Sequence, residues 1–170
     1  MSPNTPANEP LPQGDLRLLQ SPVAVELLES ALPARLAYVA KDGTPRIVPS
    51  WFHWDGEELV MPTFIQAPHV PRPAARLAVL KSSPEVAVSI DTNSTPPHIL
   101  QIRGKVSVTE VEGVAPEYAA SARKYLGEQE AAGYLASIDV PGTRMARISV
   151  RPSWVGLLDF ETRLPGGMGG

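Results

Sequence analysis

Residues 36–49 read LAYVAKDGTPRIVP, and this stretch predicts a β-hairpin. Its two halves are rich in apolar residues, and the Asp-Gly dipeptide at 42–43 between them is typical of a tight hairpin turn. The second half extends as a strand over 46–54. Another Asp-Gly pair at 55–56 leads into a short apolar run, 58–61. These three runs predict a three-stranded antiparallel meander.

The rest of the chain alternates between strand and helix patterns. Period-two alternation rich in Val and Ile predicts strands over 85–91, 98–110, 144–150 and 153–158. Helical spacing and good helix formers predict helices over 21–31, 74–80 and 116–136, the last broken near Gly127. Six or seven strands without a βαβ repeat indicate a mainly β fold class, an antiparallel barrel with attached helices.

The segment 62–73 interrupts the strand pattern with four prolines. Proline has no N–H to donate to a β-ladder, so it is rarely found in a central strand. We therefore predict a loop over the whole of 62–73.

Length and composition indicate one domain that folds without disulfides or metal. The chain has 170 residues and no cysteine, so neither a thiolate ligand nor a cysteine nucleophile is present. We place the domain at 15–164 and expect disordered tails at 1–14 and 165–170. The first tail lacks the apolar segment of a signal peptide, and no apolar run reaches the roughly 20 residues of a membrane-spanning helix. We expect a cytoplasmic protein with no membrane partner.

The usual signatures of nucleic-acid, nucleotide and metal binding are missing from the sequence. Lys and Arg are scattered in a chain of net charge −3, which excludes a basic surface for nucleic acid. The motifs G-x-G-x-x-G, G-x-x-x-x-G-K-[ST] and G-x-S-x-G do not occur. His53, His69 and His98 lie far apart without acidic partners at ligand spacing, so we expect no metal site.

Two groups of side chains are candidates for a binding site. Alternation along 51–54 places Trp51 and His53 on one face of a strand, where they either line a pocket or fill the core. Four cations flank the proline-rich segment: Arg46, Arg72, Arg76 and Lys81. Arginine offers a planar fork of donors suited to phosphate, so any two could bind an anionic group; the alternative is a solvated surface role.

A series of motifs in this order and spacing resembles one known superfamily. The motifs are LAYVAKDGTPRIVP (36–49), DGE (55–57), MPT (61–63), Arg76, PEVAV (84–88), RGKV (103–106) and RISVRP (147–152). Together they resemble the pyridoxamine-phosphate-oxidase-like flavin split barrels, nearest to the flavin/deazaflavin-dependent oxidoreductases, over most of 31–160. The resemblance implies a homodimeric split barrel that binds its cofactor in the groove between two subunits.

The resemblance also implies which residues bind the cofactor. Arg46 and Arg76 would hold its phosphate, with Thr63 as a hydroxyl donor beside it. The strand edge alongside the isoalloxazine ring would be Ile47, Val48, Pro49 and Ser50. Gln101 lies on a strand that carries a ring-contacting glutamine in pyridoxamine phosphate oxidases, although its offset from Gly104 differs from theirs by two residues.

Three departures separate the chain from a strict pyridoxamine phosphate oxidase. The segment after Thr63 is longer and proline-rich, Trp51 stands where those oxidases have a lysine, and their C-terminal Arg-x-His motif is missing. Pyridoxamine phosphate is therefore not the expected substrate. The expected cofactor is FMN, with the 8-hydroxy-5-deazaflavin coenzyme as the alternative.

The implied function is hydride transfer between the bound cofactor and a small organic substrate of unknown identity. The expected pocket residues are Trp51, His53, His69 and Trp154, with His53 or His69 as a proton donor. Core packing or simple exposure is the alternative for each of the four. No catalytic side chain is assigned, because the cofactor carries the redox chemistry. The alternative function is a non-catalytic protein of the same fold that binds or sequesters the cofactor.

Overall fold

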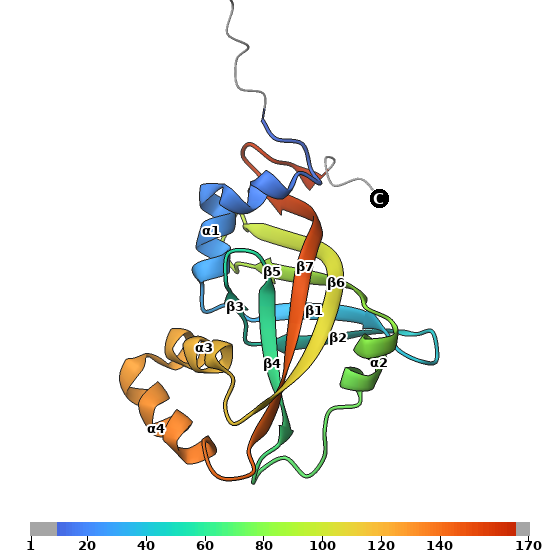
Figure 1. The fold of residues 1–170 in the computed structure, drawn as a ribbon. Helices are drawn as coiled ribbons and strands as arrows, with labels where there is room; N and C mark the ends of the chain where they lie inside the picture. The colour runs from blue at the N-terminus through green and yellow to red at the C-terminus, as the bar shows by residue number, and fades with distance from the viewer. Residues whose placement is uncertain (1–9, 166–170) are drawn as a thin grey trace, which may run out of the picture.

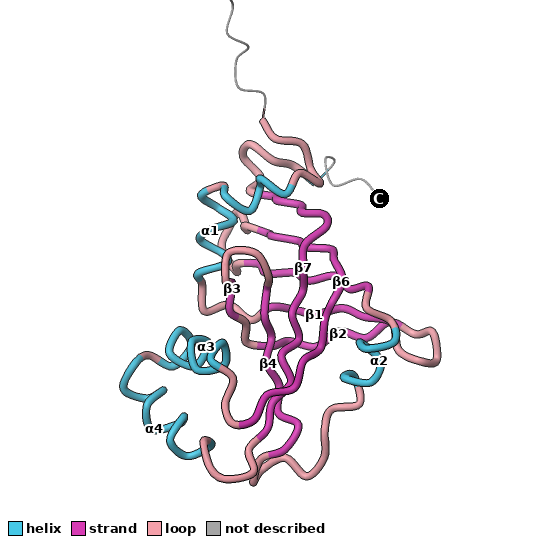
Figure 2. Tube along the Cα trace, in the orientation of Figure 1, coloured by secondary structure: helices cyan, strands magenta, loops and turns pink. Residues whose placement is uncertain are grey.

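The computed structural model describes residues 10–165, and the strands in this range form one seven-stranded antiparallel sheet (Figure 1). The strands are β1 (Ala34–Val39), β2 (Pro45–Ser50), β3 (His53–Trp54), β4 (Leu59–Gln66), β5 (Glu85–Asp91), β6 (Ile99–Glu112) and β7 (Arg144–Leu158). Their order is β2-β1-β5-β6-β7-β4-β3, so β2 and β3 form the two edges. Helices lie around the strands rather than between them (Figure 2). The mainly β fold class is confirmed, and the sheet is consistent with a split barrel.

The first hairpin is the one that the sequence predicts. β1 and β2 pair antiparallel from Ala34 opposite Ser50 to Val39 opposite Pro45. Gly43 adopts φ 77° in the turn, a left-handed conformation that glycine tolerates because it lacks a Cβ atom. β2 therefore runs along one edge of the sheet.

The two longest strands, β6 and β7, join the halves of the sheet. β6 pairs with β5 through residues 99–105 and with β7 along its whole length, and β7 pairs with β4 through 144–150. We predicted separate strands on either side of Pro152, but β7 is continuous. The register shifts between Arg103 and Gly104, and this bulge accommodates the proline without ending the strand.

The proline-rich segment differs from its prediction. β4 continues through Pro62 to Gln66, so the predicted loop over 62–73 is wrong for its first five residues. Pro62 pairs with Arg147 of β7, whereas β3 pairs only with Leu59 and Val60 on the other side of β4. From residue 61 onward one side of β4 thus has no strand partner among the described residues. A proline is tolerated there because no ladder needs its missing N–H.

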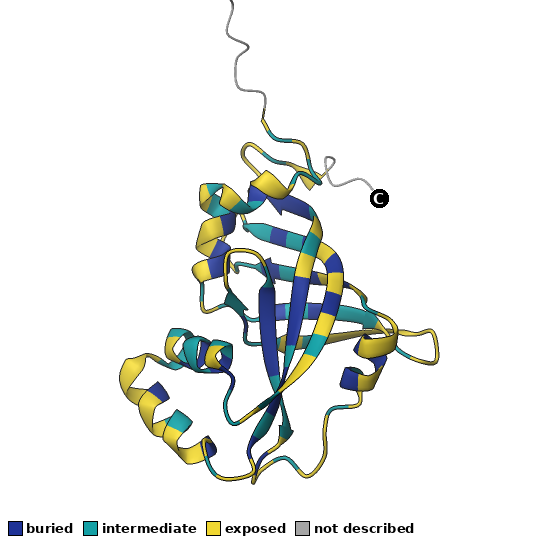
Figure 3. Cartoon of the chain, viewed as in Figure 1, coloured by how far each residue is buried: buried dark blue, intermediate teal, exposed yellow. Residues whose placement is uncertain are grey.

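Apolar side chains from the long strands fill the interior of the barrel. Figure 3 shows buried residues along these strands. Helix α1 (Pro22–Glu29) and the 3-10 helix η1 (Leu16–Gln20) contribute Leu27 and Leu18 to this core. Helix α2 (Arg76–Ser82) packs against it through Leu77 and Leu80. The largest fully buried strand residues of this core are Leu36, Leu59, Met61, Ile90, Leu100, Ile102 and Ile148.

Two further helices, α3 (Pro116–Leu126) and α4 (Glu128–Ile138), pack over β4 and the start of β7. They are separate because Gly127 adopts φ 81°, which confirms the predicted break. A second apolar cluster lies beneath them, with Tyr118 and Met145 buried and Trp51 at its margin. None of the described helices has both the length and the apolar character needed to cross a membrane.

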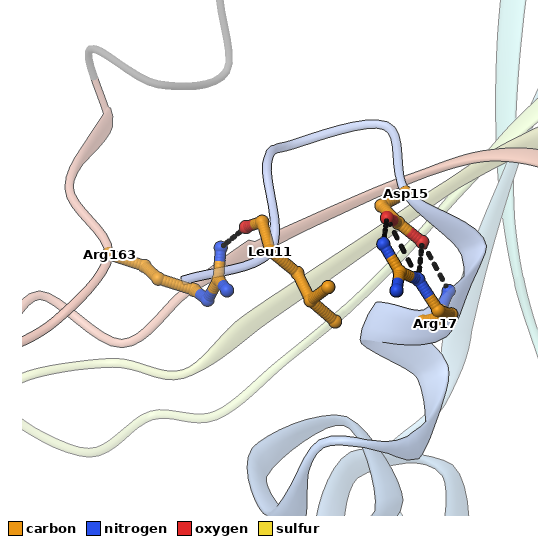
Figure 4. A network of polar contacts seen from close by, with 4 residues as sticks. All are labelled: Leu11, Asp15, Arg17 and Arg163. Carbon is orange, nitrogen blue, oxygen red and sulfur yellow. Dashed lines mark hydrogen bonds and ion pairs between the residues drawn. The ribbon is translucent and has the colours of Figure 1, made fainter. Parts of the chain in front are cut away.

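The first described residues are tied to the end of the sheet. Gln13 exchanges two hydrogen bonds with the backbone of Leu157, at 2.6 and 2.8 Å, and the Gly14 N–H donates to Val155. The Arg163 guanidinium donates to the Leu11 carbonyl at 2.7 Å (Figure 4). This differs from the expected disordered tail, which ran to residue 14, because these contacts satisfy backbone groups of β7. The rest of both expected tails, 1–9 and 166–170, lies outside the described residues.

Candidate functional site

Arg76 and Thr63 meet at one end of the barrel interior. Thr63 pairs with Ala146 and lies two residues after Met61, and both of those residues belong to the barrel core, so Thr63 faces the same way. Arg76 begins α2, which its buried residues Leu77 and Leu80 anchor to the core. The Arg76 Nη2 donates a hydrogen bond of 2.9 Å to the Thr63 Oγ1.

The Arg76 guanidinium is partly buried without a counter-charge. Among the described residues, no carboxylate lies within ion-pair distance of Arg76, and its buried Nε has no hydrogen-bond partner. Burial lowers the pKa of Arg76 below its usual value, and the nearby Tyr38 phenol partly offsets this. A partly buried cation with an unpaired donor has room in its hydrogen bonding and charge balance for an anion.

Arg46 lies on the neighbouring hairpin but does not contact Arg76. It pairs in register with Tyr38, so the two side chains share a face of the sheet. The Arg46 guanidinium is exposed, binds Asp42 at 3.1 Å and also donates to Thr44. Tyr38 therefore lies near both arginines. We did not single out Tyr38 from the sequence, although the predicted hairpin places it opposite Arg46.

The residues of β2 divide between the two faces of the sheet. Val48 packs against the barrel core. Ile47 points to the opposite side and is 67 % exposed. Pro49 alternates with Ile47, and Ser50 donates a hydrogen bond to its neighbour's carbonyl, Trp51 O, at 3.0 Å. The predicted strand edge thus presents its backbone groups and, on one face, the exposed apolar side chain of Ile47.

Gln101 and Trp154 lie on the side of the sheet that faces away from the barrel interior, which we call the outer face. Gln101 stands between the fully buried Leu100 and Ile102, so it points outward. Trp154 pairs in register with Arg103, whose guanidinium carbon lies 4.0 Å from the centroid of the Trp154 ring. Neither residue shares a face with the Arg76–Thr63 pair.

The outer face also contains a shallow apolar hollow. Ile47, Ala37, Ala87 and Arg103 follow one another across β2, β1, β5 and β6 in register. Small side chains in the middle of this row leave a space of about 440 Å³. Its lining includes Ala37, Val39, Pro45, Ala87 and Arg103.

Trp51 and His69 belong to one aromatic cluster under α3 and α4. Trp51 stacks on Tyr125 with ring centroids 5.0 Å apart and planes 12° apart. It also lies 5.9 Å from Tyr118, which contacts Phe64 at 5.2 Å, and Phe64 contacts His69 at 4.9 Å. The helix tyrosines of this cluster could not be connected with Trp51 from sequence spacing.

Residues 51–54 divide between two sides as alternation predicts, although the strand is interrupted at 51–52 between β2 and β3. Phe52 and Trp54 pack in the barrel core. Trp51 contacts Tyr118 on α3, and His53 lies near Glu117 on the same helix. Burial raises the pKa of Glu117, but a hydrogen bond from Arg147 and the charges of Arg147 and His53 lower it overall. Of the four expected pocket residues, Trp51 and His69 thus share the aromatic cluster, His53 lies near the same helix α3, and Trp154 lies on the outer face. The described residues contain no cluster of His, Cys, Asp or Glu suited to a metal ion.

Comparison with known proteins assigns the family. The profile of the pyridoxamine 5'-phosphate oxidase family matches residues 21–155, and the chain belongs to this family. The resemblance to the split-barrel superfamily drawn from the sequence is thereby confirmed. No curated protein sequence matches the chain.

Solved structures include several with the same fold. An F420 reductase shares 28 % identity and a TM-score of 0.55, over 77 % of this chain and 94 % of its own. A conserved hypothetical protein of Mycobacterium tuberculosis has a TM-score of 0.62 at 14 % identity, over 84 % and 86 % of the two chains. A putative pyridoxamine 5'-phosphate oxidase of Listeria innocua has a TM-score of 0.54 at 22 % identity, over 79 % and 94 %. The last two show the fold alone. The family match and the F420 reductase support membership of a flavin-binding family.

Proposed function

We propose that the protein is an oxidoreductase that binds a flavin or deazaflavin cofactor and holds the cofactor's phosphate at Arg76 and Thr63. The observation that carries this proposal is the partly buried Arg76 guanidinium, which has no carboxylate partner among the described residues and a buried Nε without an acceptor. A phosphate oxygen would supply both the charge and the acceptor that this group lacks.

Thr63 fits the same role. Its Oγ1 accepts a hydrogen bond from Arg76, which leaves the hydroxyl proton free to donate to a phosphate oxygen. The hydrogen bond also orients the guanidinium before the ligand binds. A pair arranged in this way loses less conformational entropy on binding than two independent side chains would.

Arg46 is proposed as a second phosphate ligand that changes partner. Its present partner Asp42 is exposed, and ion pairs between exposed side chains contribute little to stability. Releasing Asp42 therefore costs little. Arg46 and Arg76 would then approach the phosphate from the hairpin and from α2.

The ring of the cofactor is proposed to lie along the edge formed by Ile47, Val48, Pro49 and Ser50. β2 is an edge strand, so its outward backbone groups are free of a neighbouring strand among the described residues. FMN and the 8-hydroxy-5-deazaflavin coenzyme remain the two candidates. The neighbour described as an F420 reductase, at 28 % identity, supports keeping the deazaflavin in every test.

A homodimer would complete this site. The outer face carries an exposed apolar side chain, Ile47, and a hollow of about 440 Å³. Exposed apolar surface of this kind is typical of an interface. Gln101 points to the outer face, so in our proposal it contacts a cofactor only across the interface. An obligate dimer should bury roughly 2,000 Å² or more.

The bound cofactor would supply the hydride chemistry, and the chain's own residues would bind it and exclude water. Trp51 and His69 are proposed substrate-side residues through their shared aromatic cluster, which lies on the other face of β4 from Thr63. His53 and Trp154 stay candidates for the same role only if the partner subunit or a bound ligand brings them to it. The substrate remains an unspecified small organic molecule.

Titration of the protein with FMN, the deazaflavin coenzyme and riboflavin tests the proposal. Riboflavin has the same ring system as FMN but no phosphate, so it isolates the contribution of Arg76 and Thr63. We expect FMN or the deazaflavin to bind at least about tenfold more tightly than riboflavin. Equal binding of riboflavin and FMN, or no binding by any of the three, would refute the phosphate site. Turnover of an electron acceptor faster than by free cofactor would then separate an enzyme from a carrier.

A further inference from the structure

Tyr38 differs from the other tyrosines of the chain in its hydrogen bonding. Tyr118 and Tyr134 share a hydrogen bond of 2.6 Å between their hydroxyls, and the Tyr125 hydroxyl donates to the Leu32 carbonyl at 2.7 Å. In the part of the chain that the structure describes, the Tyr38 hydroxyl has no hydrogen-bond partner. The hydroxyl is also not fully buried, so a ligand can reach it. Tyr38 therefore carries a free donor.

The ring of Tyr38 is anchored on the inner side of the sheet. Tyr38 lies two positions after Leu36, which is buried in the barrel core, and its own ring packs against that core. Val39, the next residue along β1, points the other way and is exposed. A ring held by packing keeps its hydroxyl in place, so little conformational entropy is lost when the hydroxyl binds a ligand.

Two neighbouring segments bring Tyr38 close to the proposed phosphate site. On β2, Arg46 pairs in register with Tyr38. On the other side, β1 pairs with β5 through Ala37 opposite Ala87, and β5 begins shortly after α2 ends. Helix α2 therefore lies at the same end of the sheet as Tyr38 (Figure 1). The Tyr38 phenol offsets part of the effect of burial on the pKa of Arg76, the first residue of α2, so the two groups lie within electrostatic reach.

The two arginines do not satisfy the Tyr38 hydroxyl. Guanidinium groups only donate hydrogen bonds, so neither Arg46 nor Arg76 can accept the hydroxyl proton. Arg76 in turn has a buried Nε without an acceptor. A phosphate oxygen accepts hydrogen bonds from all of these groups and supplies the negative charge that Arg76 lacks. The free hydroxyl and the free Nε thus call for the same kind of ligand.

We propose that Tyr38 is a third phosphate-binding residue, which serves a terminal oxygen that a phosphomonoester has and a phosphodiester lacks. The assignment depends on the proposed phosphate site at Arg76 and Thr63, which it extends by one residue. A phosphomonoester such as that of FMN has three terminal oxygens, and a phosphodiester has two. Tyr38, Thr63 and Arg76 offer donors from β1, β4 and α2, one element for each oxygen of a monoester. The phosphate of the 8-hydroxy-5-deazaflavin coenzyme is a diester, so this site favours FMN.

Tyr38→Phe tests the proposal because it removes the hydroxyl and keeps the ring that packs on the core. Titrations of the wild type and the variant with FMN, the deazaflavin coenzyme and riboflavin give the dissociation constants. We expect the constant for FMN to rise about tenfold or more, and the constants for the other two to change by less than about twofold. The melting temperature of the apo-protein should stay the same, since the hydroxyl has no partner among residues 10–165. A clear fall would show that the protein itself satisfies the hydroxyl and would overturn the proposal.

The remaining outcomes separate this proposal from the proposed function. If Tyr38→Phe binds FMN as tightly as the wild type while Arg76→Ala does not, Tyr38 is no phosphate ligand and the site at Arg76 stands. Equal weakening of FMN and riboflavin would assign Tyr38 to the packing of the ring and overturn its role at the phosphate. A wild type that binds the deazaflavin but not FMN would overturn the preference for a monoester. Binding of neither cofactor would overturn both proposals.

Discussion

Replacing Arg76 by alanine should weaken FMN binding and leave the apo-protein folded. The substitution removes the donor to Thr63 and the guanidinium whose Nε has no acceptor. A charge-assisted hydrogen bond contributes about 1.5–3 kcal/mol, so the dissociation constant for FMN should rise about ten- to a hundredfold. Riboflavin binding should change much less, because it has no phosphate for Arg76 to contact.

Removing the charge of Arg76 should weaken FMN binding but stabilise the apo-protein. Arg76 is a partly buried cation without a carboxylate partner among the described residues, so removing it breaks no ion pair. Arg76→Met keeps the aliphatic packing and removes the charge. We expect it to raise the free energy of unfolding of the apo-protein by about 1 kcal/mol while weakening FMN binding. Chemical denaturation without and with FMN measures both effects.

Three comparisons make the assay specific. Arg76→Lys should recover only part of the affinity, because an ammonium keeps the charge but lacks the planar donor fork. Arg72→Ala, four residues earlier and exposed, is the matched control and should bind FMN like the wild type. Added salt should weaken the wild type more than Arg76→Ala. If Arg76→Ala binds FMN as tightly as the wild type, the anchor lies elsewhere, with Arg72 or Lys81 next to test.

Three other predictions concern the fold, its pH dependence and its assembly. Gly104→Ala should strongly destabilise the protein, since a Cβ atom there would lie 2.1 Å from the Arg151 carbonyl oxygen. Gly133→Ala, in open space on α4, should stabilise the protein by about 0.5–1 kcal/mol. Equal melting temperatures of the two variants would contradict the close approach at the bulge. Burial lowers the pKa of Lys124 from 10.5 in the unfolded chain to about 8 in the folded protein. Between pH 8 and 10.5 the folded state therefore binds fewer protons than the unfolded state. The free energy of unfolding should rise with pH across this window. Denaturation of wild type and Lys124→Met from pH 7 to 10.5 should show that slope only in the wild type. Ile47→Asp should convert a dimer to a monomer of 18.2 kDa in sedimentation experiments, and a wild type that is already monomeric at micromolar concentration would contradict the proposed interface.

Local patterns in the sequence were enough for most secondary-structure elements and for the family. The hairpin at 36–49 follows from two apolar runs and one Asp-Gly turn, which act within about a dozen residues of each other. The break between α3 and α4 follows from Gly127, which adopts a conformation that other residues resist. Strand β5 has the predicted bounds, 85–91, because a half-buried strand alternates regularly.

Features that depend on a neighbouring strand could not be predicted from local sequence patterns. Pro62 is compatible with β4 only because β3 is too short to pair beside it. Nothing in the sequence near residue 62 indicates how long β3 is. The continuity of β7 through Pro152 likewise depends on a bulge opposite Gly104.

The sequence by itself determined the antiparallel strands, their turns, the resemblance to the flavin split barrels and the candidate phosphate ligands Arg46, Arg76 and Thr63. Only the tertiary structure decided that Thr63 hydrogen-bonds Arg76 and that Arg46 is paired with Asp42 instead. It alone placed Lys124 over Phe52, which lies 72 positions earlier in the chain. The physical reason is the distance along the chain over which each effect acts. Turns and alternation arise from neighbouring residues. Burial and hydrogen-bond or ion-pair partners depend on which distant segments the register of the sheet brings together.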